Sequence, residues 1–121
     1  MAEEKSELMC AVRAELEHVR SLGSVDALAL VTANLSAYEA FLLVVLAGDE
    51  GVPVYQAVSD VQTNFLSQAG VLSKIKAMRT AGLLSEKPGP KRSQVCLSPS
   101  ETALRDLEQL LLGEGSGVRN E

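Results

Sequence analysis

The side chains that most clearly could bind a ligand are basic, and they gather in one part of the chain. Residues 52 to 100 hold six basic and two acidic residues, while the remainder holds five basic and fourteen acidic ones. The net charge of −5 therefore combines a segment of +4 with a remainder of −9. Clustered lysine and arginine bind phosphate groups, and this segregation lets an acidic protein present one positive surface. The alternative is a solvated basic face without a ligand.

The sequence offers few parts for catalysis or metal binding. His18 is the only histidine, and no serine or cysteine nucleophile motif accompanies it. No glycine-rich phosphate loop is present. Cys10 and Cys96 lie far apart without a CxxC or Cys/His cluster, so we expect neither a metal site nor a cofactor. We expect both thiols to be buried and structural, with a disulfide or a redox sensor as alternatives, and we expect no enzyme activity.

A helix over residues 67–81 is expected to position part of the basic segment. Ser67 is a suitable N-cap, and Gly82 permits a left-handed exit at the other end. The spacing directs one face of this helix to the core, formed by Val71, Leu72, Ile75 and Met78. The opposite face is basic and has small side chains, so its backbone can sit deep in a major groove. The candidate DNA contacts on this helix are Gln68, Ala69, Ser73, Lys74 and Lys76.

A basic hairpin is expected to follow. Residues 83–87 and 94–97 are typical of two antiparallel strands around a Pro/Gly turn. The wing, residues 87–94, would bring Lys87, Lys91 and Arg92 to a minor groove or a phosphate backbone. Ser98-Pro99-Ser100-Glu101 is a capping box that predicts a helix to Leu112. We expect residues 113–121 to form a flexible tail.

The first part of the chain predicts a helix that lacks a partner for its apolar face. An apolar stripe indicates a helix over residues 2–22. So little chain surrounds this helix that we expect a second subunit to cover it, with packing on its own domain as the alternative. The candidate dimerisation residues are Leu8, Val12, Leu16, Val19, Leu107 and Leu111. A second helical segment, residues 25–32, is expected to start at Ser24.

The centre of the domain is expected to be a buried helix. Ser36 and Glu39 have the S-x-x-E spacing of a capping box, which predicts a helix over residues 37–47. A turn at 48–51, an edge strand at 52–54 and a short helix at 55–61 should follow. The apolar run at 40–47 is too short to span a bilayer and no apolar leader is visible. We therefore expect a cytoplasmic protein without a membrane partner.

These elements predict a mostly α fold with a small β-hairpin, a winged helix-turn-helix domain. The expected parts are an N-terminal helical dimerisation segment over residues 1–33, the winged helix-turn-helix over 34–112, and the tail over 113–121. Three segments carry a resemblance to the MarR-type winged-helix transcriptional regulators. They are Leu35-Ser36 before the central helix, the exit from Met78 to Leu84, and the return from Val95 to Glu101.

The resemblance implies a homodimer that binds double-stranded DNA, usually as a repressor, with the 67–81 helix in a major groove and the wing near a minor groove. The chain departs from the family in its wing, where Gly89 and Lys91 occupy the positions of an Asp-x-Arg element and Arg92 follows one place later. The sequence specifies no small-molecule effector. The alternative is a winged-helix module that binds another protein rather than DNA.

Overall fold

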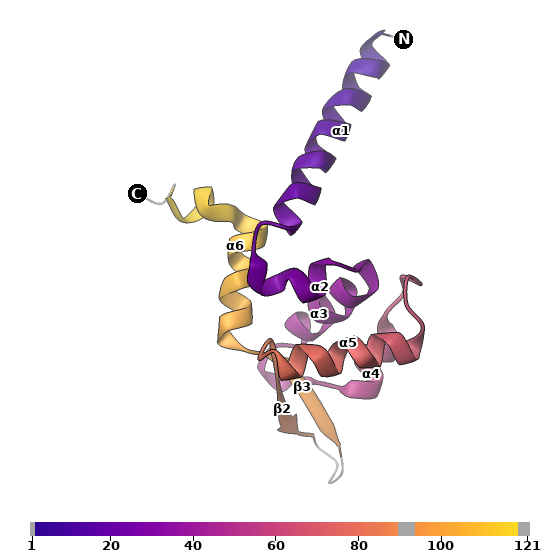
Figure 1. Cartoon of the computed structure of the whole chain (residues 1–121), viewed down its shortest axis with the longest axis vertical. Helices are drawn as coiled ribbons and strands as arrows, with labels where there is room; N and C mark the ends of the chain where they lie inside the picture. Colours follow the sequence, from indigo (N-terminus) through magenta and orange to yellow (C-terminus); the bar gives the residue numbers. More distant parts are fainter. Residues whose placement is uncertain (1, 90–93, 119–121) are drawn as a thin grey trace.

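The computed structural model describes residues 2–89 and 94–118, with side chains for 5–89 and 94–112, and it is mostly helical with one small sheet (Figure 1). Its helices are α1 (Ala2–Leu22), η1 (Asp26–Leu28), α2 (Ala29–Thr32), α3 (Leu35–Ala47), η2 (Gly48–Glu50), α4 (Val54–Asp60), α5 (Gln68–Thr80) and α6 (Glu101–Val118). Its strands are β1 (Val52–Pro53), β2 (Leu84–Pro88) and β3 (Val95–Pro99). The expected mostly α composition with a small β element is confirmed.

Helix α3 forms the centre of the domain, as its nearly continuous apolar run predicts. Phe41 and Val44 are fully buried in a core that also contains Ile75 and Met78 of α5 and Leu97 of β3. Burial of large apolar side chains from both helices and the sheet removes much apolar surface from water, which is the main favourable contribution to folding. The core therefore fixes α5 against α3 and the sheet.

The sheet has three antiparallel strands in the order β1-β3-β2. The expected edge strand is present as β1, where Val52 pairs with Leu97. The hairpin strands begin one residue later than predicted, and β3 continues to Pro99 because Ser98 pairs with Ser85 on β2. Ser98 is consequently part of the strand, and the prediction that it caps the last helix is wrong. Ser100 caps it instead, accepting a hydrogen bond from the amide N of Ala103 at 3.0 Å.

The start of α3 also differs from the prediction. Asn34 is the N-cap, because its side-chain oxygen accepts hydrogen bonds from the amide N of Ser36 at 2.9 Å and of Ala37 at 3.2 Å. The Ser36 and Glu39 side chains do not form the expected capping box. With Asn34 as the cap, both residues lie within the helix and are available to bind another part of the chain.

Two further boundaries require correction. The segment expected at 25–32 is split into η1 and α2, and Ser24 does not cap it because its hydroxyl donates to the carbonyl of Ser21 at 2.7 Å. Helix α6 continues to Val118 rather than ending at Leu112. No proline interrupts this stretch, and adding a residue to an existing helix is easier than nucleating one. The remaining part of the expected tail, 119–121, lies outside the described residues.

Helix α1 stands away from the rest of the molecule, at the end opposite the β2–β3 hairpin (Figure 1). All its side chains from residue 5 to residue 20 are exposed. The expectation of two buried thiols is therefore half wrong, because Cys10 on α1 is exposed while Cys96 on β3 is buried, and both are free. An isolated helix has no core of its own in which to bury a thiol.

Within the described part of the chain, no helix is by itself both long and apolar enough to cross a bilayer. Two consecutive helical stretches, Asp26–Thr32 and Leu35–Glu50, are together long and apolar enough to cross a bilayer, by length and composition only, and they are bent by 109° relative to each other.

Candidate nucleic-acid interface

Helix α5 is built as its sequence predicts, with a cap at one end and one side in the core. The Ser67 hydroxyl accepts a hydrogen bond from the amide N of Gly70 at 3.1 Å, which satisfies one of the amides left unpaired at a helix start. Val71, Ile75 and Met78 are buried as expected. Leu72, also expected in the core, is only half-buried because it lies at the border between α5 and α4.

The opposite side of α5 is exposed and lined by small or polar side chains. Ala69, Ser73 and Lys76 are all exposed on it. Gln68 is also exposed, but it is the first residue of α5 and lies on the stripe of the buried Ile75, seven residues further on, beside α4. Lys74, also predicted as a DNA contact, is half-buried, since the helical period places it beside the buried Val71 and Met78. The structure thus brings three of the five predicted α5 residues, Ala69, Ser73 and Lys76, to one open face, which we call the α5 face.

The end of α5 sets the direction of β2. Gly82 has φ of 85°, a backbone conformation that glycine adopts without strain. The amide N of Leu83 donates to the carbonyl of Met78 at 2.9 Å, and that of Gly82 donates to the carbonyl of Arg79 at 3.1 Å. These are the two hydrogen bonds of a Schellman ending, so the predicted exit is confirmed.

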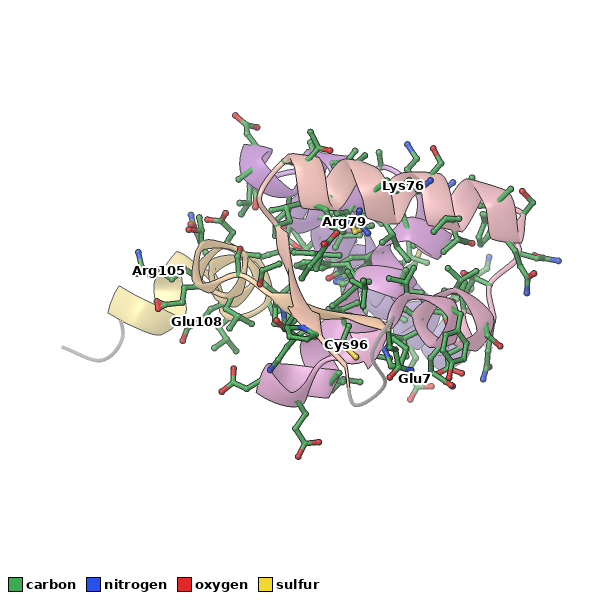
Figure 2. All side chains as sticks on the ribbon, turned by 90° about the horizontal axis from the view of Figure 1, so that it is seen from below. Glu7, Lys76, Arg79, Cys96, Arg105 and Glu108 are labelled. Atoms are coloured by element: carbon green, nitrogen blue, oxygen red, sulfur yellow. The ribbon has the colours of Figure 1, made fainter. Side chains whose placement is uncertain are left out.

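An ion pair couples α5 to the hairpin. Arg79 Nε lies 2.7 Å from Glu86 Oε2 on β2, and both side chains are partly exposed. Figure 2, viewed from below, shows Arg79 and Lys76 on the same helix. The pair fixes the hairpin against α5, and it also neutralises one of the six basic residues counted in this segment. Glu86 is one of the two acidic residues already included in the net charge of +4 for this segment, so the pairing leaves that charge unchanged but makes Arg79 less available to a phosphate group.

Lys87 does not share a side of the sheet with the α5 face. Side chains alternate along a strand, and Glu86 points to α5, so Lys87 points to the other side. There it lies beside Gly51, where an added Cβ would meet Lys87 Cδ at 3.2 Å. Lys91 and Arg92, the other two predicted wing contacts, lie outside the described residues.

A polar clamp, formed by Ser36 and Glu39 of α3, holds the connection between α4 and α5. The Glu39 carboxylate accepts hydrogen bonds from the amide N of Gln62 at 2.9 Å and from the amide N and hydroxyl of Thr63, each at 2.8 Å. The Ser36 hydroxyl is buried, donates to the carbonyl of Thr63 at 2.9 Å and accepts from the amide N of Phe65 at 2.9 Å.

Hydrogen bonds to the ionised carboxylate lower the pKa of Glu39 below its usual value, the amide of Thr63 contributing most, while burial opposes the shift. The sequence indicated these two residues through their S-x-x-E spacing but assigned them to the cap of their own helix. Their actual partners lie more than twenty residues away, so no local pattern could reveal the contact. The clamp fixes where α5 begins relative to α3.

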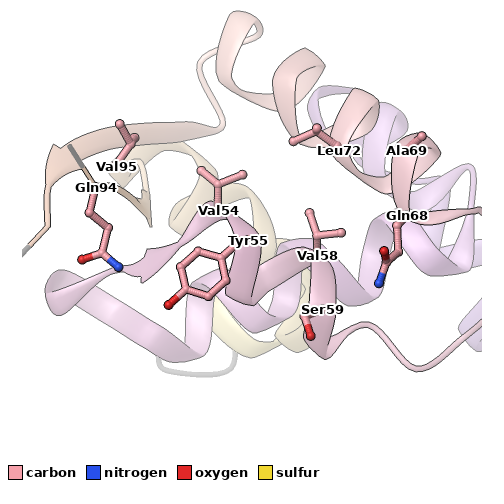
Figure 3. Close-up of a pocket in the computed structure, with 9 residues that line it drawn as sticks. All are labelled: Val54, Tyr55, Val58, Ser59, Gln68, Ala69, Leu72, Gln94 and Val95. Carbon is pink, nitrogen blue, oxygen red and sulfur yellow. The ribbon is translucent and has the colours of Figure 1, made fainter. Parts of the chain in front are cut away.

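An apolar hollow of about 620 Å³ lies beside the start of α5 (Figure 3). Its wall is formed by α4, α5 and the start of β3. The lining residues are Val54, Tyr55, Val58, Ser59, Gln68, Ala69, Leu72, Gln94 and Val95. Tyr55 is 65% exposed, so the hollow opens to solvent next to the α5 face. No local sequence pattern indicates this hollow, because its residues come from three separate segments.

Among the residues that the structure describes, no three His, Cys, Asp or Glu side chains lie close enough together to hold a metal ion. Comparisons with family models, with curated proteins and with solved structures found no match to this chain.

Proposed function

We propose that the chain is a winged helix-turn-helix protein of MarR-like type that binds double-stranded DNA as a homodimer and represses transcription. The observation that carries the proposal is the order α3, β1, α4, α5, β2, β3 with the antiparallel arrangement β1-β3-β2. In a winged helix this order makes α4 and α5 the helix-turn-helix pair and the β2–β3 connection the wing.

The α5 face supports DNA as the partner. A DNA-recognition helix needs small side chains where its backbone approaches the bases. It also needs polar or basic side chains that reach base edges and phosphates. Ala69 and Ser73 meet the first need, and Lys76 meets the second. Gln68 adds an exposed amide at the first position of the helix, next to this face. The clamp and the Schellman ending hold both ends of this helix, which gives a rigid element for recognition. The repressor role rests on the family resemblance.

Substitution of Lys76 tests this function. Lys76→Ala should weaken binding of the full chain to duplex DNA about tenfold, because each copy in the dimer would lose a phosphate or base contact. Arg105→Ala, at an exposed position of α6, is the matched control and should leave the affinity unchanged. Fluorescence anisotropy on a pool of genomic fragments measures both, and Arg92→Ala tests the wing in the same assay. Equal affinities for wild type, Lys76→Ala and Arg92→Ala would remove the DNA assignment.

The apolar hollow favours a second candidate, a winged-helix module that binds another protein. DNA-binding surfaces are polar and strongly positive, whereas Val58, Leu72 and Val95 bring apolar surface to the side of the α5 face. If duplex DNA does not bind even at low salt, this candidate replaces the first. Leu72→Glu would then abolish partner binding, while Lys76→Ala would have little effect.

A further inference from the structure

We infer that α1 pairs in parallel with α1 of a second copy as a short two-stranded coiled coil. This pairing places the winged-helix parts of both copies at the same end of the dimer. The inference deepens the homodimer of the proposed function and rests on it. Dimerisation alone leaves open whether the two α1 helices run in the same or in opposite directions. The spacing of apolar and charged residues on α1, together with its position in the fold, answers that question.

The apolar residues of α1 follow a coiled-coil repeat. Met9, Val12, Leu16 and Val19 recur at steps of three, four and three, which are the a, d, a and d positions of two heptads. Their side chains are 44% to 53% exposed, although such residues normally lie in a core. The preceding d position holds Lys5, so the apolar seam begins at Met9. Arg13, Glu15 and Arg20 limit the seam on both sides between residues 13 and 20, which suits two strands rather than a wider bundle, while Leu8, at the preceding g position and 57% exposed, widens the apolar surface at the start of the seam.

The charges that flank the seam select the parallel direction. Glu15 is at a g position and Arg20, five residues later, is at the next e position. In a parallel pair each g residue faces the e residue five places on in the partner, so Glu15 of one chain meets Arg20 of the other twice by symmetry. In an antiparallel pair g faces g and e faces e, which sets Glu15 against Glu15. Within one chain Arg20 makes only an exposed contact with Glu17 at 3.8 Å, which the interchain pair can replace.

The shape of the molecule agrees with this direction. Helix α1 has 21 residues and is therefore about 31 Å long. The rest of the domain lies at its C-terminal end (Figure 1). Parallel pairing places two bodies side by side with both hairpins pointing away from the coil. Antiparallel pairing would place them at opposite ends of the rod, facing in opposite directions, where one duplex could not contact both.

Cysteine cross-linking distinguishes the two directions without any DNA. In a full-length Cys10→Ser background, Val19→Cys places two thiols face to face in the parallel coil, and air oxidation should give a covalent dimer. In an antiparallel coil centred on the same seam, residue 19 faces residue 9, so two cysteines at 19 would be about 15 Å apart, beyond disulfide reach. Glu17→Cys, at nearly the same height but on the outer side of the helix, is the matched control and should remain uncross-linked.

Charge exchange gives a second measurement. Glu15→Arg should weaken self-association about tenfold, and Glu15→Arg combined with Arg20→Glu should restore it, as measured by sedimentation equilibrium.

A monomer mass for wild type at high protein concentration would overturn both this inference and the homodimer of the proposed function. A dimer mass without the Val19→Cys cross-link, but with one in the Met9→Cys/Val19→Cys double variant, would overturn the parallel direction alone. A tetramer mass would overturn the two-stranded coil. A cross-linked dimer that fails to bind duplex DNA would leave this inference standing and reject the DNA assignment.

Discussion

Replacement of Glu39 by glutamine should destabilise the domain, because the carboxylate accepts three hydrogen bonds from the α4–α5 connection. A glutamine amide keeps one oxygen, so its NH₂ group would face at least one donor that the carboxylate had satisfied. A hydrogen bond to a charged group contributes about 1.5 to 3 kcal/mol. Glu39 is only half-buried, and solvent screening reduces this value. We therefore expect Glu39→Gln to lower the free energy of unfolding by about 1 to 2 kcal/mol.

For a domain of this size that loss should lower Tm by about 4 to 8 °C, measured by circular dichroism at neutral pH and a fixed protein concentration. The effect should depend on pH. Because the pKa of Glu39 is lowered by folding, its contribution is complete above the unfolded-state pKa of about 4.3 and is lost as pH falls through the lower folded-state pKa. The difference between wild type and variant should therefore disappear in strong acid.

Glu108→Gln is the matched control for this experiment, since Glu108 is exposed on α6, and it should leave Tm nearly unchanged. A Glu39→Gln variant that melts with wild type at neutral pH would refute the clamp. A difference that persists unchanged in acid would refute the role of the charge.

Two further substitutions test how the helix ends are built. Asn34→Ala should lower the unfolding free energy by about 1 kcal/mol in urea titrations, because it removes the acceptor for two amides at the start of α3; no change would show that another group caps α3. Gly82→Ala should cost about 1 to 2 kcal/mol from backbone strain at positive φ alone, since nothing lies within 4 Å of the added Cβ. Gly23→Ala, where φ is not positive and the nearest atom is 3.8 Å away, is its control, and equal stability of the two variants would contradict the argument.

Local patterns predicted the elements well where the signal was contained in the element itself. The apolar run of α3, the Ser67 cap and the Gly82 exit are examples, because helix periodicity and terminal hydrogen bonds involve residues only a few places apart. Both S-x-x-E boxes were located near a true helix start, yet each cap was assigned two residues away from the real one. Ser98 pairs with Ser85 in the sheet and therefore does not cap α6. Asn34 caps α3, so the Ser36 side chain can bind a distant part of the chain.

The candidate site was less predictable than the fold. Periodicity correctly placed Ser73 and Lys76 on an open face. Lys87 was assigned to the wing from its sequence position, and strand alternation places it on the side of the sheet away from the α5 face, so its DNA contact stays a prediction. Among the proposed dimerisation residues, Leu8, Val12, Leu16, Val19 and Leu111 are exposed, whereas Leu107 is 5% exposed in the core of the chain itself and has little surface left for a second subunit. An amphipathic stripe identifies an apolar face but does not specify which surface covers it.

The salt dependence of duplex binding tests the central claim most directly. Full-length protein should bind a duplex in low salt, and the logarithm of its association constant should fall linearly with the logarithm of salt concentration. If two copies together neutralise about four to eight phosphates, the slope should be about −4 to −7, and Lys76→Ala should make it shallower. No detectable binding at 50 mM salt, or an affinity that does not change with salt, would contradict the account.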